Sequence, residues 1–321
     1  MTMPNNMSVN KNSLRLLRKI MENPEERGMI VEETEGGAKI IDSGIEANGG
    51  YHAGKIITEI CLGGYGRAEI FFIQYGDVEL PSISVYTDHP AIATLGSQFA
   101  GWRIKVGSYQ AIGSGPARAL ALKPKELYEK IGYRDYSDLA VIVLETSTKP
   151  TKEVLEYISK ECDVNLDKLY VFLAPTSSLA GSTQVSGRIV ETGLHKLMEV
   201  GFDPKKAVSG LGYAPIAPVH PKFVEAMGRT NDMILYGGVV YFTVEWDDDR
   251  KLREMVELIP SSKSKDYGKP FATLFKAAGY DFYKIDPALF APAVVMVNNV
   301  KTGRVFKAGQ INVEILKQTI L

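Results

Sequence analysis

The fold class is indicated by a stretch that begins with Leu139-Ala-Val-Ile-Val-Leu144, a continuous apolar run of the length of one buried strand. A helical pattern follows over Thr151–Cys162, a second short apolar run over Leu169–Leu173, and a second helical pattern over Thr183–Glu199. Strands that alternate with helices in this way predict a βαβα unit with parallel strands.

The regions on either side of this unit carry other patterns. Before it we expect an amphipathic helix over 12–21, short strands with Gly-rich turns over 29–106, and helices after Pro116 and Pro124. After it we expect further elements: a Pro/Gly-rich connector over 210–221, a helix near 222–227, a strand over 233–246, a helix over 247–258 and a strand over 293–298. The chain is therefore expected to be α+β or α/β, with two intimately packed lobes over residues 1–140 and 141–321.

Composition narrows the class of protein. The 321 residues include 37 Lys and Arg against 38 Asp and Glu, and 45% are hydrophobic, which suits a globular chain with a large core and no global positive field for nucleic acid. The two cysteines, Cys61 and Cys162, offer neither a disulfide framework nor a thiolate metal site. Residues 1–12 are polar, and no apolar run of about 18 residues follows, so we expect a cytoplasmic protein that does not bind membranes.

Several familiar catalytic motifs are missing from the sequence. It contains no Gly-x-x-x-x-Gly-Lys-Ser/Thr loop, no Gly-x-Ser-x-Gly elbow, and no complete Gly-x-Gly-x-x-Gly fingerprint after a strand. None of the four histidines is in His-Glu-x-x-His spacing. We therefore expect neither a metal site nor a nucleotide cofactor.

One predicted helix carries a polar face of reactive residues. At 100° per residue, Gln184, Arg188, Glu191 and His195 share one side of the helix over 183–199, so Arg188 and Glu191 are i, i+3 neighbours. Such a pair is often a solvated surface feature. The Ser/Thr/Gly-dense approach at 175–187 also allows a ligand to come close to the backbone.

Two other regions are candidates for ligand binding. Residues 101–130 hold six basic and two acidic residues, and a Gly/Ser-rich turn at a predicted helix start within them could bind a phosphate or a carboxylate, although a solvated basic surface explains the same pattern. Asp88 and His89 lie in a loop after a predicted strand, where a turn or capping role for Asp88 is the alternative.

Longer strings of sequence resemble a known family. They are Glu59-Ile-Cys-Leu-Gly-Gly64, Thr87-Asp-His-Pro-Ala-Ile-Ala93, Leu95-Gly-Ser-Gln98, Ala100-Gly-Trp102, Gly113-Ser-Gly-Pro-Ala-Arg-Ala-Leu-Ala-Leu-Lys-Pro-Lys-Glu126 and Ser186-Gly-Arg-Ile-Val-Glu-Thr-Gly193. Together they closely resemble the methenyltetrahydromethanopterin cyclohydrolases, along nearly the whole chain.

The resemblance implies a fold and an activity. It implies a two-domain α/β subunit with the pterin in a cleft between the lobes, commonly assembled as a homotrimer. The implied reaction opens the methenyl bridge of methenyl-tetrahydromethanopterin with water and gives the formyl derivative, reversibly, in the one-carbon metabolism of methanogenesis. It implies no metal and no redox cofactor, because the pterin coenzyme is itself the substrate.

The resemblance also implies site residues. Glu191 and Arg188 fall on the family's catalytic Glu and Arg. The other positions that we expect to contact the small-molecule substrate lie in the matching loops: Asp88, His89, Ser97, Ser114, Arg118 and Lys123. Arg118 and Lys123 are the preferred partners for the coenzyme's phosphate and tail carboxylates. The alternative functions are a non-catalytic pterin or organic-phosphate binding protein and a formyltransferase.

Overall fold

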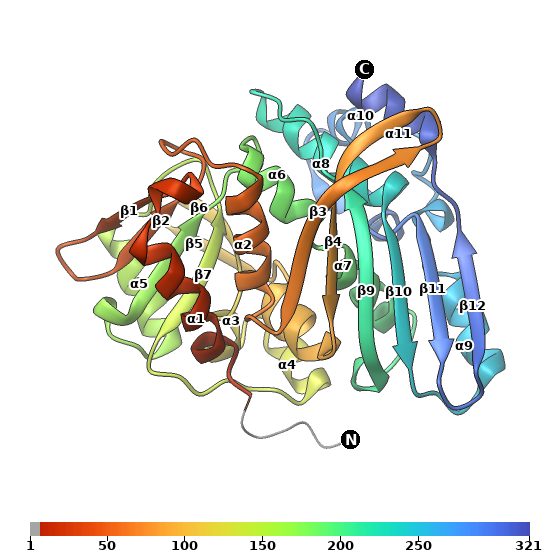
Figure 1. Cartoon of the computed structure of the whole chain (residues 1–321), viewed down its shortest axis with the longest axis horizontal. Coiled ribbons are helices and arrows are strands. Elements are labelled where there is room, and N and C mark those ends of the chain that lie inside the picture. The colour runs from red at the N-terminus through yellow and green to blue at the C-terminus, as the bar shows by residue number, and fades with distance from the viewer. Residues whose placement is uncertain (1–6) are drawn as a thin grey trace. The chain divides into compact units, whose positions relative to one another are not determined.

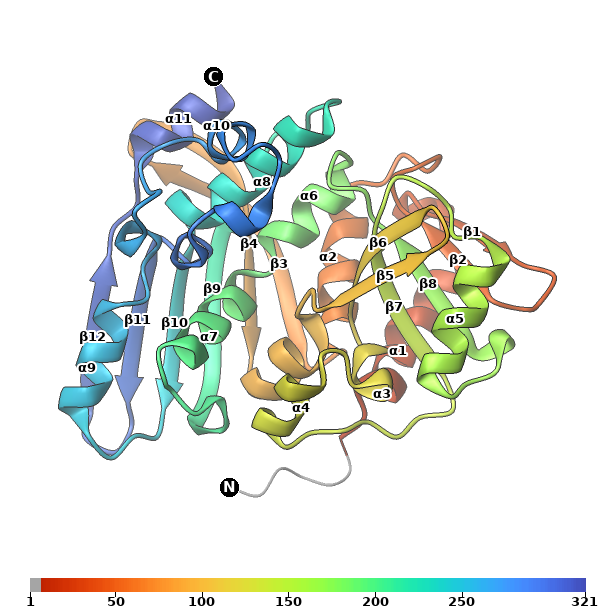
Figure 2. The same cartoon turned by 180° about the vertical axis from the view of Figure 1, so that it is seen from behind.

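The computed structural model describes residues 7–321, without the side chain of Tyr283. Residues 1–6, the first half of the polar start considered above, lie outside the described residues. The chain forms two compact units, shown in Figures 1 and 2. Unit 1 contains the chain up to Arg67 together with Ala91–Gln184, and unit 2 contains Ala68–Pro90 together with Val185–Leu321. The sequence analysis expected a single boundary at residue 140, whereas both units are discontinuous.

Unit 1 is built on a mixed six-stranded sheet with the strand order β1-β2-β8-β7-β6-β5. The strands β2, β8 and β7 are parallel to one another, and the remaining pairs are antiparallel. The six strands are β1 (Ile30–Glu33), β2 (Lys39–Asp42), β5 (Trp102–Val106), β6 (Tyr109–Ser114), β7 (Ala140–Glu145) and β8 (Leu169–Leu173). The predicted parallel βαβ unit, β7-α5-β8, is thus confirmed.

Helices cover both faces of this sheet, because β7 and β8 are apolar on both sides. Helix α5 (Lys152–Cys162) packs on one face, while α1 (Val9–Glu22) and α2 (Tyr51–Cys61) pack on the other. The unit also contains the π-helix η2 (Ala91–Gln98), α3 (Arg118–Ala121) and α4 (Lys125–Ile131). The Ser8 side chain accepts a hydrogen bond from the Lys11 backbone N–H and so caps the first helix.

Unit 2 contains a second mixed six-stranded sheet with the order β12-β11-β10-β9-β4-β3. Only β10 and β11 are parallel among the strand pairs whose register is described. The strands are β3 (Gly66–Tyr75), β4 (Val78–Thr87), β9 (Ala207–Pro215), β10 (Val239–Val244), β11 (Val294–Asn299) and β12 (Arg304–Gly309). With the helices α7 (Ile189–Glu199), α8 (Phe223–Gly237), α9 (Asp249–Glu257), α10 (Phe271–Ala277) and α11 (Val313–Ile320), this unit is also α/β, as expected.

Part of one face of the second sheet has no helix over it (Figure 1). The strand registers place Tyr86, Leu211, Tyr241, Met296 and Lys307 in one row across β4, β9, β10, β11 and β12. Tyr86 and Leu211 are each 48% exposed. We call this row the open row; it is an apolar strip with a basic end.

Several predicted elements are wrong in type or extent. Residues 51–61 form α2 rather than part of a sheet, and 207–215 form β9 rather than a connector. Residues 223–237 form α8, so that the strand expected from Met233 begins only at Val239. Glycine made the sequence of β9 resemble a connector. A Cβ at Gly210 would lie 2.7 Å from the Val190 side chain, so glycine is needed where α7 packs on the strand.

Candidate active site

The Arg188 and Glu191 side chains form a buried ion pair at the start of α7. Arg188 Nη1 lies 3.4 Å from Glu191 Oε2, and the two residues are only 8% and 6% exposed. Taking two charges out of water is costly, and a surface pair does not incur that cost. The alternative of a solvated surface pair is therefore excluded for these residues.

Helix α7 is fixed in place by the packing of the face opposite the ion pair. Val190, Leu194 and Leu197 on that face are fully buried. Gly193 lets the helix lie close to β10, because a Cβ there would come 2.8 Å from the Val240 side chain and 3.1 Å from Phe242. Close packing of the apolar face leaves the backbone little freedom at the residues that carry the charges.

The helix predicted over 183–199 is interrupted at residues 187 and 188. It consists of α6 (Leu179–Ser186) and α7, separated by a turn at Gly187 and Arg188. The Arg188 backbone N–H donates to Val185 O at 3.0 Å, and its carbonyl accepts from Thr192 at 2.8 Å. Glycine in the turn and the Ser/Thr-rich composition of α6 are the sequence features that explain the break. Arg188 therefore stands at the N-cap of α7, outside the regular helix.

His195, the last member of the predicted polar face, belongs to a different contact. Its Nδ1 lies 3.7 Å from Glu199 Oε1, one turn further along α7. Lys196, which is 7% exposed, also pairs with Glu199, at 2.9 Å. These three residues form a cluster at the C-terminal end of the helix, where a positive charge also interacts favourably with the helix dipole.

Asp88 and His89 lie in the same unit as the ion pair. Both are exposed, directly after β4, which packs against α7. The His89 backbone N–H donates to the buried Thr87 hydroxyl at 3.0 Å, which fixes the start of the loop. Both side chains are thus on an accessible segment, as a substrate-binding role requires.

Ser97 and Ser114 are buried inside unit 1. Ser97 is fully buried, and its hydroxyl donates to Cys61 O at 2.6 Å. Ser114 is 2% exposed, and its hydroxyl lies 3.7 Å from Cys61 Sγ and 3.5 Å from Val143 O. These contacts join η2 and β6 to neighbouring elements of the core, which is typical of packing residues rather than of residues that meet a ligand.

Arg118 is also buried, contrary to the interpretation of 101–130 as a basic surface. Its side chain has no exposed area, and its guanidinium donates to the backbone carbonyls of Lys123 at 2.8 Å, Ser97 at 3.0 Å and Leu95 at 3.3 Å. It also lies over the rings of Phe99 and Tyr128. An anion could reach this group only if the contacts among η2, α3 and α4 were broken. The role of Arg118 as a ligand of the coenzyme's phosphate stays a prediction.

The Lys123 side chain already forms an ion pair. Its ammonium lies 2.6 Å from Glu161 Oε2, and the hydrogen bond to Glu161 raises the pKa of Lys123. About a third of each side chain is exposed. Lys123 is therefore reachable, but a phosphate would have to compete with a carboxylate that is already in place.

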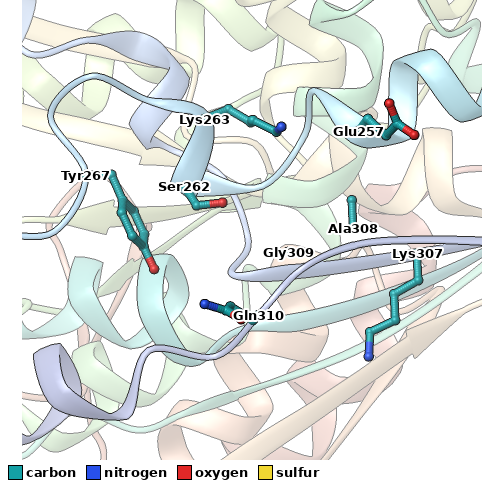
Figure 3. Close-up of a pocket in the computed structure, with 8 residues that line it drawn as sticks. All are labelled: Glu257, Ser262, Lys263, Tyr267, Lys307, Ala308, Gly309 and Gln310. Atoms are coloured by element: carbon teal, nitrogen blue, oxygen red, sulfur yellow. The ribbon is translucent and has the colours of Figure 1, made fainter.

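A cavity of about 450 Å³ lies elsewhere in unit 2 (Figure 3). Its lining consists of Glu257, Ser262, Lys263, Tyr267, Lys307, Ala308, Gly309 and Gln310. In Figure 3 the ammonium of Lys307 points away from that of Lys263, so the two cations do not converge on one ligand. None of the eight predicted site residues lines it. Among residues 7–321 no group of three His, Cys, Asp or Glu side chains could hold a metal ion, and no helix is long and apolar enough to cross a membrane.

Comparison with known proteins places the chain in a family. The family model described as "Cyclohydrolase (MCH)" matches residues 8–320. A relative from Methanocaldococcus jannaschii is 49% identical over 317 residues, which is 98% of both chains, and one from Methanococcoides burtonii is 46% identical over 98% of both chains. A third, from Methanothermobacter marburgensis, is 46% identical over 98% of this chain and 99% of its own. All three are named methenyltetrahydromethanopterin cyclohydrolase, and this chain belongs to the same cyclohydrolase family.

Proposed function

We propose that this chain hydrolyses the methenyl bridge of methenyl-tetrahydromethanopterin to the formyl derivative, reversibly, with Glu191 and Arg188 as its catalytic residues. The observation that carries the proposal is the buried 3.4 Å ion pair at the start of α7, in a chain of the cyclohydrolase family. The family does not favour a non-catalytic binding protein or a formyltransferase.

The chemistry requires little more than a placed water and a proton carrier. The bridge carbon lies between two nitrogens and is part of a cation, so it is already electrophilic. Attack by water forms one C–O bond and releases one proton, which a carboxylate can accept in the same step. The reaction involves no oxidation or reduction. We therefore propose that no cofactor takes part and that the coenzyme is the substrate.

We assign Glu191 the role of general base and then of general acid. It removes a proton from the attacking water, and it returns that proton to the ring-opening nitrogen as the C–N bond breaks. Arg188 contacts Oε2 of Glu191, which leaves Oε1 to exchange the proton. The guanidinium holds the carboxylate in one orientation, and this favours the geometry needed for proton transfer.

We propose Asp88 and His89 as the substrate-binding residues best supported among those expected. Both are exposed in unit 2, which also carries the ion pair. Lys123 remains a weaker candidate for the distal anions because Glu161 already occupies it. Ser97, Ser114 and Arg118 we instead assign to the core of unit 1.

We further propose that the chain forms a homo-oligomer, a trimer by resemblance, and acts in the cytoplasm. The open row supports oligomerisation, because its neighbouring Tyr86 and Leu211 side chains are exposed and apolar, and exposed apolar patches are typical of interaction surfaces. Cys61 and Cys162 support a reducing compartment, since both are buried and neither is in a disulfide.

Loss of the near-ultraviolet absorbance of the methenyl substrate tests the activity directly. The purified protein should bleach that band without added metal or nucleotide. Glu191→Gln keeps the shape of the side chain but cannot accept the proton, so its kcat should fall on the order of 10²-fold or more while the coenzyme still binds. Tight binding by the wild type without turnover would support the non-catalytic alternative, and full activity of the variant would remove Glu191 from the mechanism.

A further inference from the structure

Helix α7 lies close to strands β9 and β10 of its own sheet because glycine stands where the helix crosses them (Figure 2). A Cβ at Gly210 of β9 would lie 2.7 Å from Val190 Cγ1, whereas two carbon atoms in contact are about 3.5–4.0 Å apart. A Cβ at Gly212, on the same face of the strand, would lie 3.2 Å from Ile189 Cγ1. The distance between helix and strand therefore depends on the absence of side chains at these two positions.

The two helix residues at this contact have no room to move aside. Ile189 and Val190 are both fully buried. Ile189 also packs on Gly238, just before β10, where a Cβ would lie 2.6 Å from its Cδ1. Both side chains are β-branched, and such side chains keep one strongly preferred χ1 rotamer in a helix. A methyl group added at Gly210 would therefore displace the backbone of α7 together with the Val190 side chain.

The contact involves the sequence neighbours of the ion pair. Ile189 directly follows Arg188. Val190 directly precedes Glu191, and all four residues belong to unit 2. To relieve an added methyl group at Gly210, Val190 would have to move by about 0.7 Å, to the 3.4 Å at which ordinary van der Waals contact begins. Both charged side chains would move with the helix, because they are attached to the same turn.

The strands beneath the helix can keep their positions during such a shift. Gly210 pairs with Thr87 at the end of β4, and the loop with Asp88 and His89 begins there. The φ angle of Gly210 is not positive, so alanine fits its backbone and preserves the pairing of the two strands. A methyl group at residue 210 therefore moves Glu191 relative to β4 and leaves the start of the proposed substrate-binding loop in place.

We propose that Gly210 is a positioning residue for the reaction, acting through Val190 to set the depth at which α7 holds the ion pair. In the proposed function, on which this inference rests, Glu191 takes a proton from the attacking water. A general base must lie within about 2.6–3.2 Å of the atom whose proton it removes, a range of about 0.6 Å. The displacement of about 0.7 Å that a methyl group requires is larger than this range. Misplacement by about 1 Å can lower a rate about 10²-fold.

Gly210→Ala tests this assignment with a single methyl group. Its kcat should fall about tenfold or more at an unchanged KM for the methenyl coenzyme, because the base moves and the start of the substrate-binding loop does not. The double variant Gly210→Ala/Val190→Ala lacks Cγ1, the atom that the methyl group meets, so its kcat should return to within about threefold of wild type. Val190→Ala alone should also stay within about threefold, since it leaves a cavity and forces no displacement.

Gly228→Ala is the matched control, because it creates an overlap of similar size in unit 2 between two other helices. A Cβ there would lie 2.6 Å from Ala272 Cβ, where α8 packs on α10. Its Tm should fall by at least as much as that of Gly210→Ala, because both variants overpack a buried contact. Its kcat, measured well below the Tm of both variants, should stay within about threefold of wild type.

The assignment is overturned by an unchanged kcat or a rise in KM alone in Gly210→Ala, by a loss of kcat that Val190→Ala does not restore, or by an equal loss in Gly228→Ala. If Gly210→Ala does not fold, Val190→Ile adds a methyl group to the same side chain at the same contact, and a kcat equal to that of wild type would refute the proposal. An inactive wild-type enzyme would instead refute the proposed function, so the two failures are distinguishable.

Discussion

Replacement of Asp232 by Asn should make the protein more stable, increasingly so as the pH rises. Asp232 on α8 is 1% exposed, and burial raises the pKa of its carboxyl from 3.8 to about 7. Its oxygens accept hydrogen bonds from the Phe271 N–H at 2.8 Å and the Thr319 hydroxyl at 2.8 Å. No positively charged group contributes to the shift of its pKa. Asn preserves both contacts, since its amide oxygen accepts from Phe271 and its nitrogen donates to Thr319.

The magnitude follows from the linkage of pKa to stability. Because the folded pKa lies above the unfolded one, the unfolded state loses its proton first, and stability falls as the pH rises from about 4 to about 7. A shift of about three units costs about 4 kcal/mol in the free energy of unfolding once the group is ionised in both states. Asp232→Asn removes this cost, so its advantage over wild type should be about 3 kcal/mol greater at pH 8 than at pH 5.

Urea denaturation of both proteins at pH 5 and pH 8 measures this difference. The m-values should agree between the variants, so that a change in midpoint reports stability. Thr319→Val is a useful control, because it removes the hydroxyl partner of the carboxylate and should destabilise wild type most at high pH. The same stability difference between Asp232→Asn and wild type at both pH values would refute the reasoning, since it would place the ionisation outside this range.

Two further predictions concern the core of unit 1 and the open row. Arg118→Met retains an apolar stem but leaves two buried carbonyls and one partly buried carbonyl without this donor, so the free energy of unfolding should fall on the order of 3–5 kcal/mol while KM for the coenzyme changes little. Chemical denaturation and steady-state kinetics check this, and a rise in KM at unchanged stability would indicate that Arg118 is a ligand. Leu211→Lys places a charge in the open row beside Tyr86, so sedimentation velocity should show a larger assembly for wild type and a monomer for the variant; identical profiles would exclude this face as the interface.

The predictable part of the fold was the part that follows simple periodicity. The buried strands β7 and β8 and the helix between them were identified because continuous apolar runs and an amphipathic helix have distinct patterns. Strand β9 was missed because Gly210 serves close packing by α7 and resembles a turn signal in the sequence. The exchange of segments between the units was also missed, since a local pattern does not reveal which sheet a strand joins.

The candidate site shows the same limit. The i, i+3 spacing of Arg188 and Glu191 is visible in the sequence, but only the burial seen in the structure distinguishes their pair from a surface pair of the same spacing. Arg118 was misjudged for the converse reason: a cation in a basic stretch is usually exposed, and only tertiary contacts show that backbone carbonyls surround this one. Gln184 Oε1 is buried without a hydrogen-bond partner among the described residues, and the sequence carries no signal of this because it depends on the packing of the neighbouring side chains.

Each unit is built from two separate segments of the chain, and this affects folding during synthesis. Strand β4 forms its ladder with β9, and Val85 faces Gly212 in that register. The ribosome adds about 5–20 residues per second, so β4 is synthesised roughly 6 to 25 s before its partner β9. During that interval β3 is the one neighbour of β4 in the sheet that has been synthesised, and the edge of β4 that pairs with β9 stays without its native partner. Nascent chains of this protein should therefore depend on chaperones that hold residues 68–90, and a chain truncated before residue 207 should aggregate rather than fold.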